Sequence, residues 1–439
     1  MDEVRNVFMT GATGVMGMAA LKEFFSSPFS YNVTVLARDS KKNRKKLSSF
    51  ESKGLNVIWG DLLDKEKLSE GIKNADIVLH VGGMVSPEAD LKPELTLKIN
   101  LESIKSITEI IKEIENTTPD RTIALVYIGS VSQYGSHLPP YHWGGVGMKL
   151  SAAKQDAYAY SKIMAERTVV EAGLKKWVSL RQTAILHPGL LKKTDNPVMF
   201  HVPLNGALEW VTDEDSGRLL ERVSRNNVPD DFWNNFYNVG GGKDYRLTNI
   251  EFERKLLKAL RCPSPEKIFE TNWFALDNFH GIWFKDSDRL NDILKFRKGT
   301  GFDAYMESMR RRLPFYFKLA PLAPSFVIKK FMKKVVQKEP LGPLSWIKKN
   351  EIDKIKVFWG SLENYRNIPK WEHLSYPALK RESEGSEEIN QVCKEKDLKL
   401  DYKTCHKGHK YLSSEFMEKT GGHSCPYCLK ESTELKFLN

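Results

Sequence analysis

Cysteines are scarce in this sequence, and long apolar runs are missing. Five of its 439 residues are Cys, and four of the five fall within the last fifty positions. An odd number with this distribution argues against a disulfide framework and favours a reducing, cytoplasmic compartment. No apolar stretch approaches the roughly 18 residues of a membrane-spanning helix. The N-terminus runs directly into a predicted strand, so we expect no secretory signal.

The remaining composition is ordinary apart from its charge. Hydrophobic residues make up 41% and charged residues 28%, as in typical globular proteins. A chain of 439 residues has room for two or three domains. The net charge of +11 suits anionic ligands, an anionic membrane surface or nucleic acid, and does not choose among them.

A glycine-rich turn follows the first predicted strand, residues 4–9. Gly11, Gly14 and Gly17 are spaced G-x-x-G-x-x-G, and a helical stretch continues to about residue 25. The first glycine allows the tight turn, the second lets the backbone approach a pyrophosphate, and the third lets the helix pack closely on the sheet. The N–H groups of that helix then face the phosphates. The pattern predicts a dinucleotide site, against the alternative of a turn without a ligand.

The second predicted strand, residues 32–37, ends in Arg38. An acidic residue at this place selects NAD, whereas an Arg suits the 2′-phosphate of NADP. Asp39 is one residue past the expected position and keeps NAD open. We expect NADP(H), against the plainer alternative of a solvated basic start to the next helix.

Strands and helices continue to alternate along the chain. This order predicts an α/β fold with a doubly wound parallel sheet. The further strands are expected over residues 55–59, 75–81, 123–128 and 178–186, with a long helix over residues 97–114.

Small or polar residues follow several of these strands. Gly82 and Gly83 leave room for the backbone beside a cofactor, and Ser130 follows the next strand. Asp61 and Leu62 lie where a loop would cover an adenine ring. Ligands of parallel sheets bind beyond the carboxyl ends of the strands, so we expect these residues to lie near the glycine turn.

Tyr158 and Lys162 are four residues apart in a helical stretch. Side chains at this spacing share one face of a helix. A nearby positive charge favours the phenolate, so we expect Lys162 to lower the Tyr158 pKa from its usual value of about 10. A phenol tuned in this way can act as an acid–base group. Tyr160 lacks such a partner, because Met164 lies four residues on.

In this order the motifs resemble the extended short-chain dehydrogenase/reductases, an epimerase/dehydratase-like group that includes nucleotide-sugar epimerases, dihydroflavonol reductases and hydroxysteroid dehydrogenases. The resemblance covers about residues 4–310. The motifs are T-G-A-T-G-V-M-G at 10–17, G-D-L-L-D at 60–64, H-V-G-G at 80–83, Asn100, G-S-V-S-Q-Y-G at 129–135 and Y-A-Y-S-K at 158–162.

The resemblance implies a role for each motif residue. Ser130 would be the hydrogen-bonding serine, Tyr158 the acid–base group and Lys162 the residue that binds the nicotinamide ribose. Asn100 would support the site, and Ser132 stands where family members often touch the substrate. The implied cofactor-binding residues are Gly11, Thr13, Gly14, Val15, Met16, Gly17, Arg38, Asp61, Leu62, Gly82, Gly83, Asn100, Tyr158 and Lys162.

The chain departs from the sugar-nucleotide members of that group after the last predicted strand. Those members usually carry an Asn and a Tyr-Gly-Pro run, whereas residues 181–188 read Arg-Gln-Thr-Ala-Ile-Leu-His-Pro. This departure argues against a sugar-nucleotide substrate. Two sets of aromatic residues either line an apolar substrate site or simply pack its surroundings: Tyr141, His142 and Trp143, and Trp273, Phe274, Phe279, Trp283 and Phe284.

Residues 326–338 alternate apolar pairs with lysine pairs at helical spacing. A basic amphipathic helix of this kind can lie on an anionic bilayer. The plainer alternative, which we favour, is a solvated helix packed on the rest of the protein.

The C-terminal tail carries a predicted metal site. Cys405, His409, Cys425 and Cys428 have the C-x-x-x-H and C-P-x-C spacings of a tetrahedral zinc site. The tail is too short to fold on an apolar core, so zinc would supply the stability. It resembles small treble-clef or zinc-ribbon modules, in which the zinc is structural. His406 and His423 are rival ligands, and unliganded thiols are the alternative.

We therefore divide the chain into five parts. They are an NADP-binding Rossmann domain (1–189), a smaller substrate-binding portion (190–310), a basic, aromatic helical extension (311–380), a charged linker (381–400) and a zinc-binding module (401–439).

The predicted function is an NADP(H)-dependent oxidoreductase. Hydride would pass between nicotinamide and a carbonyl, alcohol or conjugated enone of a hydrophobic, steroid- or lipid-like substrate. The alternatives are a nucleotide-sugar epimerase or dehydratase with bound NAD(P), and a non-catalytic NADP-sensing regulator that binds through its zinc tail. The family resemblance also implies a homodimer, and we do not expect nucleic-acid binding.

Overall fold

A parallel sheet forms the centre of the molecule. The computed structural model describes residues 4–190, 196–315, 323–382, 402–404 and 410–412. Within this part of the chain, seven strands pair in the order β11-β7-β5-β4-β1-β2-β3, all parallel. Their bounds are β1 (Arg5–Thr10), β2 (Tyr31–Ala37), β3 (Asn56–Trp59), β4 (Ile77–His80), β5 (Ala124–Ser130), β7 (Lys176–Gln182) and β11 (Asn235–Val239). The predicted doubly wound α/β fold is confirmed.

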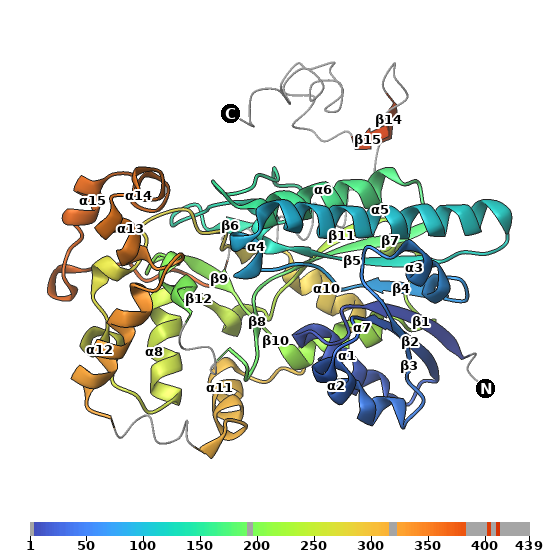
Figure 1. Cartoon of the computed structure of the whole chain (residues 1–439), viewed down its shortest axis with the longest axis horizontal. Helices are drawn as coiled ribbons and strands as arrows, with labels where there is room; N and C mark the ends of the chain where they lie inside the picture. The colour runs from blue at the N-terminus through green and yellow to red at the C-terminus, as the bar shows by residue number, and fades with distance from the viewer. Residues whose placement is uncertain (1–3, 191–195, 316–322, 383–401, 405–409, 413–439) are drawn as a thin grey trace.

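Helices cover both faces of the sheet (Figure 1). One apolar layer lies between the sheet and α3, α5 and α6, and the other lies between the sheet and α1, α7 and α10. Because both faces are covered, β4 and β5 are buried along their whole length and read as continuous apolar runs. The helices are α1 (Val15–Phe24), α2 (Lys41–Glu51), α3 (Lys65–Ile72), α4 (Glu88–Leu91), α5 (Pro93–Thr117), α6 (Ala157–Glu171), α7 (Asp213–Val223) and α10 (Ser287–Leu294).

The sheet takes its last strand from beyond the boundary expected at residue 189. β11 pairs with β7 in parallel, so that Asn235 lies opposite Val178. Helix α7 packs tightly on α1, since a Cβ at Gly217 would lie only 2.5 Å from the Ala19 carbonyl carbon. The parallel sheet and the smaller portion therefore interlock.

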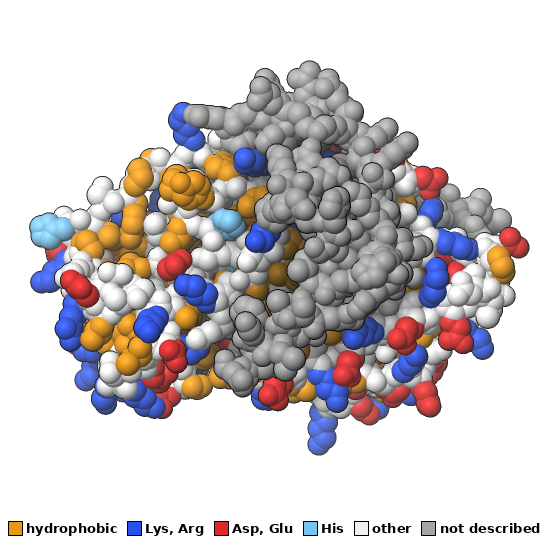
Figure 2. All heavy atoms as spheres, turned by 90° about the horizontal axis from the view of Figure 1, so that it is seen from above, with side chains coloured by type: hydrophobic (Ala, Val, Ile, Leu, Met, Phe, Trp, Pro, Cys, Tyr) orange, Lys and Arg blue, Asp and Glu red, His pale blue; other side chains and the backbone are white. Residues whose placement is uncertain are grey.

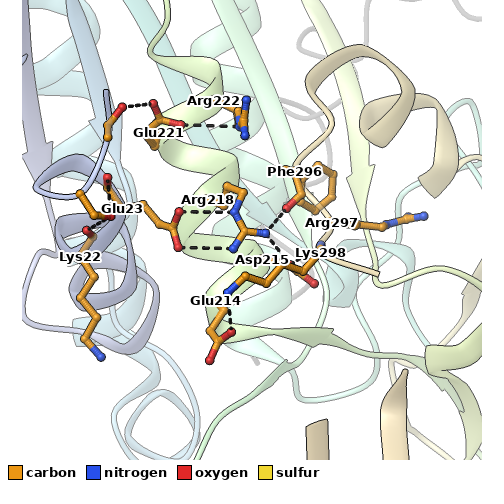
Figure 3. Close-up of polar contacts among 12 residues, drawn as sticks. Lys22, Glu23, Glu214, Asp215, Arg218, Glu221, Arg222, Phe296, Arg297 and Lys298 are labelled. Atoms are coloured by element: carbon orange, nitrogen blue, oxygen red, sulfur yellow. Dashed lines mark hydrogen bonds and ion pairs between the residues drawn. The ribbon is translucent and has the colours of Figure 1, made fainter. Parts of the chain in front are cut away.

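A polar cluster fixes α7 to α1, the helix that follows the glycine turn (Figure 3). Arg218 of α7 pairs with Glu23 of α1, Nε to Oε2 3.3 Å, and also donates to the Phe296 carbonyl at 3.0 Å. Asp215 accepts a hydrogen bond from the Lys298 backbone at 2.9 Å. Because these groups are largely buried, their pairing removes the cost of isolated charges and holds α1 in place.

Short strand pairs build the smaller portion and join it to segments that precede residue 190. β6 (Trp143–Gly144) pairs with β13 (Trp283–Phe284), β8 (Ile185–Leu186) with β10 (Val211–Thr212), and β9 (Ala207–Glu209) with β12 (Arg246–Thr248). Glu209 is fully buried at their centre. It accepts hydrogen bonds from Arg246 at 2.9 Å, from Ser287 at 2.6 Å and from two backbone N–H groups. One buried carboxylate thus joins segments that are distant in the sequence.

Further helices extend the smaller portion, on the left of Figure 1. They are α8 (Asn249–Ala259), α9 (Pro265–Ile268), α11 (Phe302–Arg311), α12 (Ser325–Val336), α13 (Pro343–Lys349), α14 (Ile352–Trp359) and α15 (Leu362–Arg366). The Trp359 indole donates to the Phe274 carbonyl at 3.0 Å, which ties α14 to the smaller portion. Of the described helices, none has the length and apolar composition needed to cross a membrane.

Figure 2 shows the face of the molecule seen from above Figure 1. In its described part, basic and acidic side chains are interspersed, and apolar side chains appear among them on the left. Two short strands, β14 (Tyr402–Thr404) and β15 (Lys410–Leu412), pair antiparallel and are the described part of the C-terminal tail.

Candidate active site

The carboxyl ends of β1, β4 and β5 bring the predicted glycines and Ser130 to one edge of the sheet. Gly11 has a φ of +74°, and a Cβ there would lie 2.5 Å from the Gly82 backbone nitrogen. A Cβ at Gly17 would lie 2.4 Å from the Gly11 carbonyl oxygen. Both positions therefore require glycine, and the predicted tight turn and close helix packing are confirmed.

A cavity of about 320 Å³ borders this turn. It is lined by Thr13, Gly14, Val15, Met18, Ala19, Lys22, Lys46, His187 and Asp213. No side chain caps the start of α1 at Gly14, so its first N–H groups remain open to an anion. Lys46 adds positive charge, and its Nζ donates to the Thr13 carbonyl at 2.6 Å. Met16 differs from its neighbours because its side chain points into the core.

Arg38 lies directly after β2 and is exposed. Its guanidinium has no acidic partner among the described residues. The neighbouring Asp39 accepts two hydrogen bonds from Arg44, at 2.6 and 2.7 Å, and this contact lowers the pKa of Asp39. The Arg44 guanidinium lies 4.5 Å from the centre of the Trp59 ring. Asp39, the acidic residue that left NAD as an alternative cofactor, is therefore already paired with Arg44, whose guanidinium stacks on Trp59.

Leu62 and Asp61 lie in the loop after β3. The Leu62 Cδ1 atom lies 3.1 Å from where a Cβ of Gly82 would stand, so this side chain reaches the glycine edge. Asp61 is exposed and accepts a hydrogen bond from the Leu63 backbone at 3.1 Å. The predicted adenine-side residues thus flank the strand ends.

Lys162 is buried on α6, one turn after Tyr158. Its Nζ donates to the Ile128 carbonyl at 2.8 Å and lies 5.1 Å from the centre of the Tyr127 ring. Burial lowers the pKa of Lys162 to about 8, against an opposing effect of Glu166. Its ammonium therefore has one backbone acceptor and keeps further N–H groups for a ligand.

Tyr158 lies close enough to Ser130 for the serine hydroxyl to act on its pKa. Burial raises the pKa of Tyr158 to about 12, the Ser130 contact lowers it, and Asp156 raises it. The expectation that Lys162 lowers this pKa is wrong, because burial dominates and the Lys162 amine donates to the Ile128 carbonyl. The phenol is consequently protonated at neutral pH.

Ser130 is positioned by its neighbours at the end of β5. Its Oγ accepts hydrogen bonds from the Ser132 hydroxyl at 2.9 Å and from the Ser132 backbone at 3.2 Å. With these lone pairs occupied, the Ser130 proton is free to be donated. Ser132 itself is fully buried behind Ser130. It supports the serine from behind and has no exposed surface for a substrate.

Asn100 of α5 joins the loop after β4 to α6. Its side chain exchanges two hydrogen bonds with the Met84 backbone, at 2.7 and 3.1 Å, and donates to the Ser161 hydroxyl at 2.9 Å. A Cβ at Gly83 would lie 2.9 Å from the Asn100 Oδ1 atom. The glycine loop is thereby fixed beside the helix that carries Tyr158.

A buried polar chain behind the site was not predicted from the sequence. Arg181 of β7 donates twice to Glu166 of α6, at 3.0 and 2.7 Å, and once to the Tyr134 hydroxyl at 2.8 Å. Tyr134 donates to Asn238 at 2.7 Å, and Asn238 donates to Asp286 at 2.7 Å. The chain links α6 to the smaller portion. Its one signal in the sequence was Glu166, which stands one helical turn after Lys162.

Asp156 and His280 form a second unpredicted pair at the start of α6. Asp156 caps the helix by accepting from the Ala159 backbone at 2.8 Å, and it contacts the His280 Nδ1 atom at 3.0 Å. Burial alone would lower the pKa of His280, but the contact with Asp156 raises it above its ordinary value. When protonated, His280 screens the Asp156 carboxylate, which raises the pKa of Tyr158.

Most of the aromatic residues suspected of forming a flat binding wall are core residues. Trp273, Phe274, Trp283 and Phe284 are each 3% exposed or less, and Phe279 is partly buried. His142 is buried edge-on against Trp283, with ring centres 4.8 Å apart, whereas Tyr141 is 79% exposed. Core packing is therefore the correct reading for the four buried side chains.

The predicted zinc ligands Cys405, His409, Cys425 and Cys428 lie outside the described residues. Within the described ranges, no group of three or more His, Cys, Asp or Glu side chains is placed to hold a metal ion. The zinc site stays a prediction.

Comparison with known proteins supports the nucleotide-binding reading of this edge. Residues 7–196 match the model of the NAD dependent epimerase/dehydratase family. The chain is 27% identical over 106 residues to UDP-N-acetylglucosamine 4,6-dehydratase (inverting) of Campylobacter jejuni, covering 24% of this chain and 32% of that protein. It is 30% identical over 122 residues to the decarboxylating sterol-4-alpha-carboxylate 3-dehydrogenase of Dictyostelium discoideum, covering 28% and 34%. The matches thus span about a third of these curated relatives.

The fold is also that of solved structures. UDP-glucose 4-epimerase of Thermus thermophilus, in complex with NAD, superposes with a TM-score of 0.53 at 18% identity, covering 70% of this chain and 98% of that one. dTDP-glucose 4,6-dehydratase of Bacillus anthracis, also with NAD, gives 0.54 at 16% identity, covering 70% and 96%. At such low identity the likeness shows a shared fold and no more.

Proposed function

We propose that this protein is an NADP(H)-dependent oxidoreductase acting on a carbonyl or alcohol. The proposal rests on one observation: the Tyr158 phenol, whose pKa the nearby Ser130 hydroxyl lowers, lies one helical turn from the buried Lys162 amine, at the edge that carries the glycine turn. These three groups are the acid, the hydrogen-bond donor and the cation that carbonyl chemistry needs.

The residues at this edge fit a dinucleotide. Gly11 and Gly82 leave no side chain between the strand ends, the start of α1 at Gly14 opens onto a cavity, and Arg38 offers a free guanidinium. Arg38 suits a 2′-phosphate, and Lys162 would hold the nicotinamide ribose. When bound, the nicotinamide supplies or accepts the hydride. The match of residues 7–196 to an NAD dependent family supports a dinucleotide, and Arg38 supports NADP(H) in particular.

The chain's own residues would manage the proton. Because the Tyr158 pKa is raised to about 12, the phenol starts protonated and can give its proton to a substrate oxygen. Ser130 has its lone pairs occupied by Ser132, so its proton can be donated to the same oxygen. Two donors on one oxygen stabilise the negative charge that develops during reduction.

A hydrophobic, steroid- or lipid-like substrate is our preferred class. Residues 181–188 lack the Asn and the Tyr-Gly-Pro run that sugar-nucleotide members usually carry there. Arg181, the first residue of this run, is engaged with Glu166 and Tyr134 and is not free to bind a ligand. The similarity to a sterol dehydrogenase supports this choice. The similarity to a UDP-N-acetylglucosamine dehydratase keeps a nucleotide-sugar epimerase or dehydratase as the second candidate.

Cofactor turnover tests the first candidate against the second. NADPH oxidation should proceed with lipophilic ketones, and Tyr158→Phe should lower the rate about 10²- to 10⁴-fold. Tyr160→Phe is the matched control, because Tyr160 is exposed on the same helix. A sugar-nucleotide enzyme would instead retain its dinucleotide and leave added NADPH unchanged. Equal rates for the two Phe variants would remove Tyr158 from the mechanism.

A structural zinc in the tail is a separate proposal, supported by the spacing of its Cys and His residues. Metal analysis of the purified full chain should find zinc, and Cys425→Ser should lose it, whereas Cys262→Ser should not. Full zinc content in Cys425→Ser would refute this ligand set. The non-catalytic regulator would be the better description under two conditions. The tail would have to bind a partner, and Tyr158→Phe would have to leave the rate of NADPH oxidation unchanged.

A further inference from the structure

The outer face of α12 combines exposed apolar side chains with lysines. Phe326 is 70% exposed, Phe331 47% and Val327 44%. Lys330 and Lys334 are exposed on the same turns of the helix. Single exposed apolar residues are common, but a cluster of them on one helix marks a surface that contacts something other than water.

The inner face of α12 is fixed to the protein. Met332, Val335 and Val336 are buried in a cluster that includes Phe269. Lys329 forms an ion pair with Glu270. The expected packing of this helix on the rest of the protein is therefore confirmed for its inner face. The same packing leaves Phe326 and Phe331 exposed, at the two margins of the outer face.

The end of α11 adds to this surface. Phe315, four residues after α11, is 74% exposed. In Figure 1 the end of α11 and the start of α12 lie at the same lower edge of the molecule. Residues 309–338 contain nine Lys and Arg and no Asp or Glu. The three arginines of this stretch are partly neutralised by Glu307 and Glu214, so Lys330 and Lys334 of α12, unpaired among the described residues, add positive charge to this surface.

We propose that this α12 surface, made of Phe315, Phe326, Val327, Lys330, Phe331 and Lys334, docks on an anionic phospholipid bilayer. Aromatic side chains on an amphipathic helix enter the headgroup region, while lysines contact the acidic lipid heads. Nucleic acid or an acidic protein would satisfy the lysines and leave the phenylalanines in water.

Docking of this kind is peripheral and would bring the smaller portion close to the membrane. A lipophilic substrate partitions into the bilayer, so an enzyme held at the surface meets it at high local concentration. The inference does not depend on the reaction proposed above, because it rests on the α12 surface alone. Its test accordingly measures binding and not turnover.

Vesicle sedimentation with the full chain tests the proposal. The protein should sediment with vesicles enriched in phosphatidylserine and remain in solution with vesicles of phosphatidylcholine alone. Replacing Lys330 and Lys334 together by Gln should weaken binding about thirtyfold, at about fivefold for each lysine near a charged surface. Phe326→Ser with Phe331→Ser should weaken binding at equal net charge.

Matched controls separate this surface from the overall charge. Lys53→Gln with Lys73→Gln removes two exposed lysines elsewhere, and Ile352→Ser removes an exposed apolar side chain of α14. Both controls should bind vesicles as the wild type does, and all variants should keep its unfolding temperature. Vesicle binding that the α12 variants leave unchanged would overturn the proposal. The proposal would also be overturned if the protein bound RNA or polyglutamate more tightly than the vesicles and if the Phe variants left that binding unchanged.

Discussion

Two buried cations, Lys162 and Arg181, lie on neighbouring elements and have opposite surroundings. Arg181 is held by Glu166 through two hydrogen bonds and by Tyr134 through a third. Lys162 has one backbone carbonyl and one aromatic ring. Burial alone would lower the pKa of Arg181, but Glu166 raises it above its usual range, whereas burial lowers the pKa of Lys162 to about 8.

The difference separates structure from function. A buried charge with all its partners stabilises an arrangement of the chain, and a buried charge that lacks partners is kept for a ligand. Arg181 thus fixes β7 to α6, while Lys162 remains available at the strand ends. Changes to these two residues should accordingly affect different quantities.

The largest effect on folding is expected for Arg181→Met. The change leaves Glu166 buried without its cation, which typically costs about 3–5 kcal/mol of unfolding free energy. Chemical denaturation measures this loss. The double variant Glu166→Leu with Arg181→Met should recover much of it, because no charge is then left alone. A single variant as stable as the wild type would contradict the structural role of the pair.

Lys162→Met should lower turnover and leave the stability of the fold intact. We expect NADPH turnover to fall at least about 100-fold, since the charge that meets the cofactor and the phenol is lost. The unfolding free energy should not fall, because an incompletely paired buried amine is removed. Turnover assays and denaturation of the same preparation measure both quantities. If Lys162→Met strongly lowered the unfolding free energy, Lys162 would have a structural role like that of Arg181.

The pH dependence of stability sharpens the same comparison. The folded pKa of Lys162 is about 8 and the unfolded value is 10.5. Between these values the unfolded chain binds more protons than the folded one, so this residue makes stability rise with pH. The wild type should therefore gain stability relative to Lys162→Met from pH 8 to pH 10.5. A constant difference across this range would contradict the lowered pKa.

Arg38→Asp should change cofactor preference by a smaller amount. Losing one charged contact to a 2′-phosphate costs about 1.5–3 kcal/mol, which is about tenfold to a hundredfold in the ratio of NADPH to NADH efficiency. Lys42→Asp is the matched control, because it makes the same charge change on the exposed side of α2. An unchanged ratio in Arg38→Asp would place the phosphate elsewhere.

The smallest effect is expected for His280→Gln. The raised pKa of His280 means that its pairing with Asp156 stabilises the fold below pH 6.5, and that this contribution is lost as pH rises through the folded value. The side chain is 33% exposed, so solvent screening keeps the contribution below about 1 kcal/mol. Thermal unfolding at several pH values should show the difference from wild type shrinking above neutrality. His373→Gln, on an exposed residue, should show none.

The sequence was sufficient to predict the strands β1 to β5 and β7 and the glycine turn. Strands that are buried on both faces, such as β4 and β5, read as apolar runs, and Gly11, Gly14 and Gly17 have spacings with a direct backbone reason. Local patterns therefore located the edge of the sheet where the candidate site lies.

Contacts between distant segments could not be predicted from the sequence. Residues 235–239 carry no feature that distinguishes β11 from the short strands of the smaller portion, and only its pairing with β7 places it in the sheet. The Tyr158 pKa was misjudged because burial depends on the assembled fold. For the same reason the partners of Arg181 could not be named, since Tyr134 and Glu166 approach it from separate elements.

The seventh strand has a practical consequence for anyone dividing this protein. A fragment ending at residue 189 would expose the edge of β7 that β11 covers, together with the surface of α1 on which Gly217 rests. An unpaired apolar edge of this kind recruits other chains. During synthesis, too, the ribosome must release the chain well past residue 239 before the first half of the molecule can close.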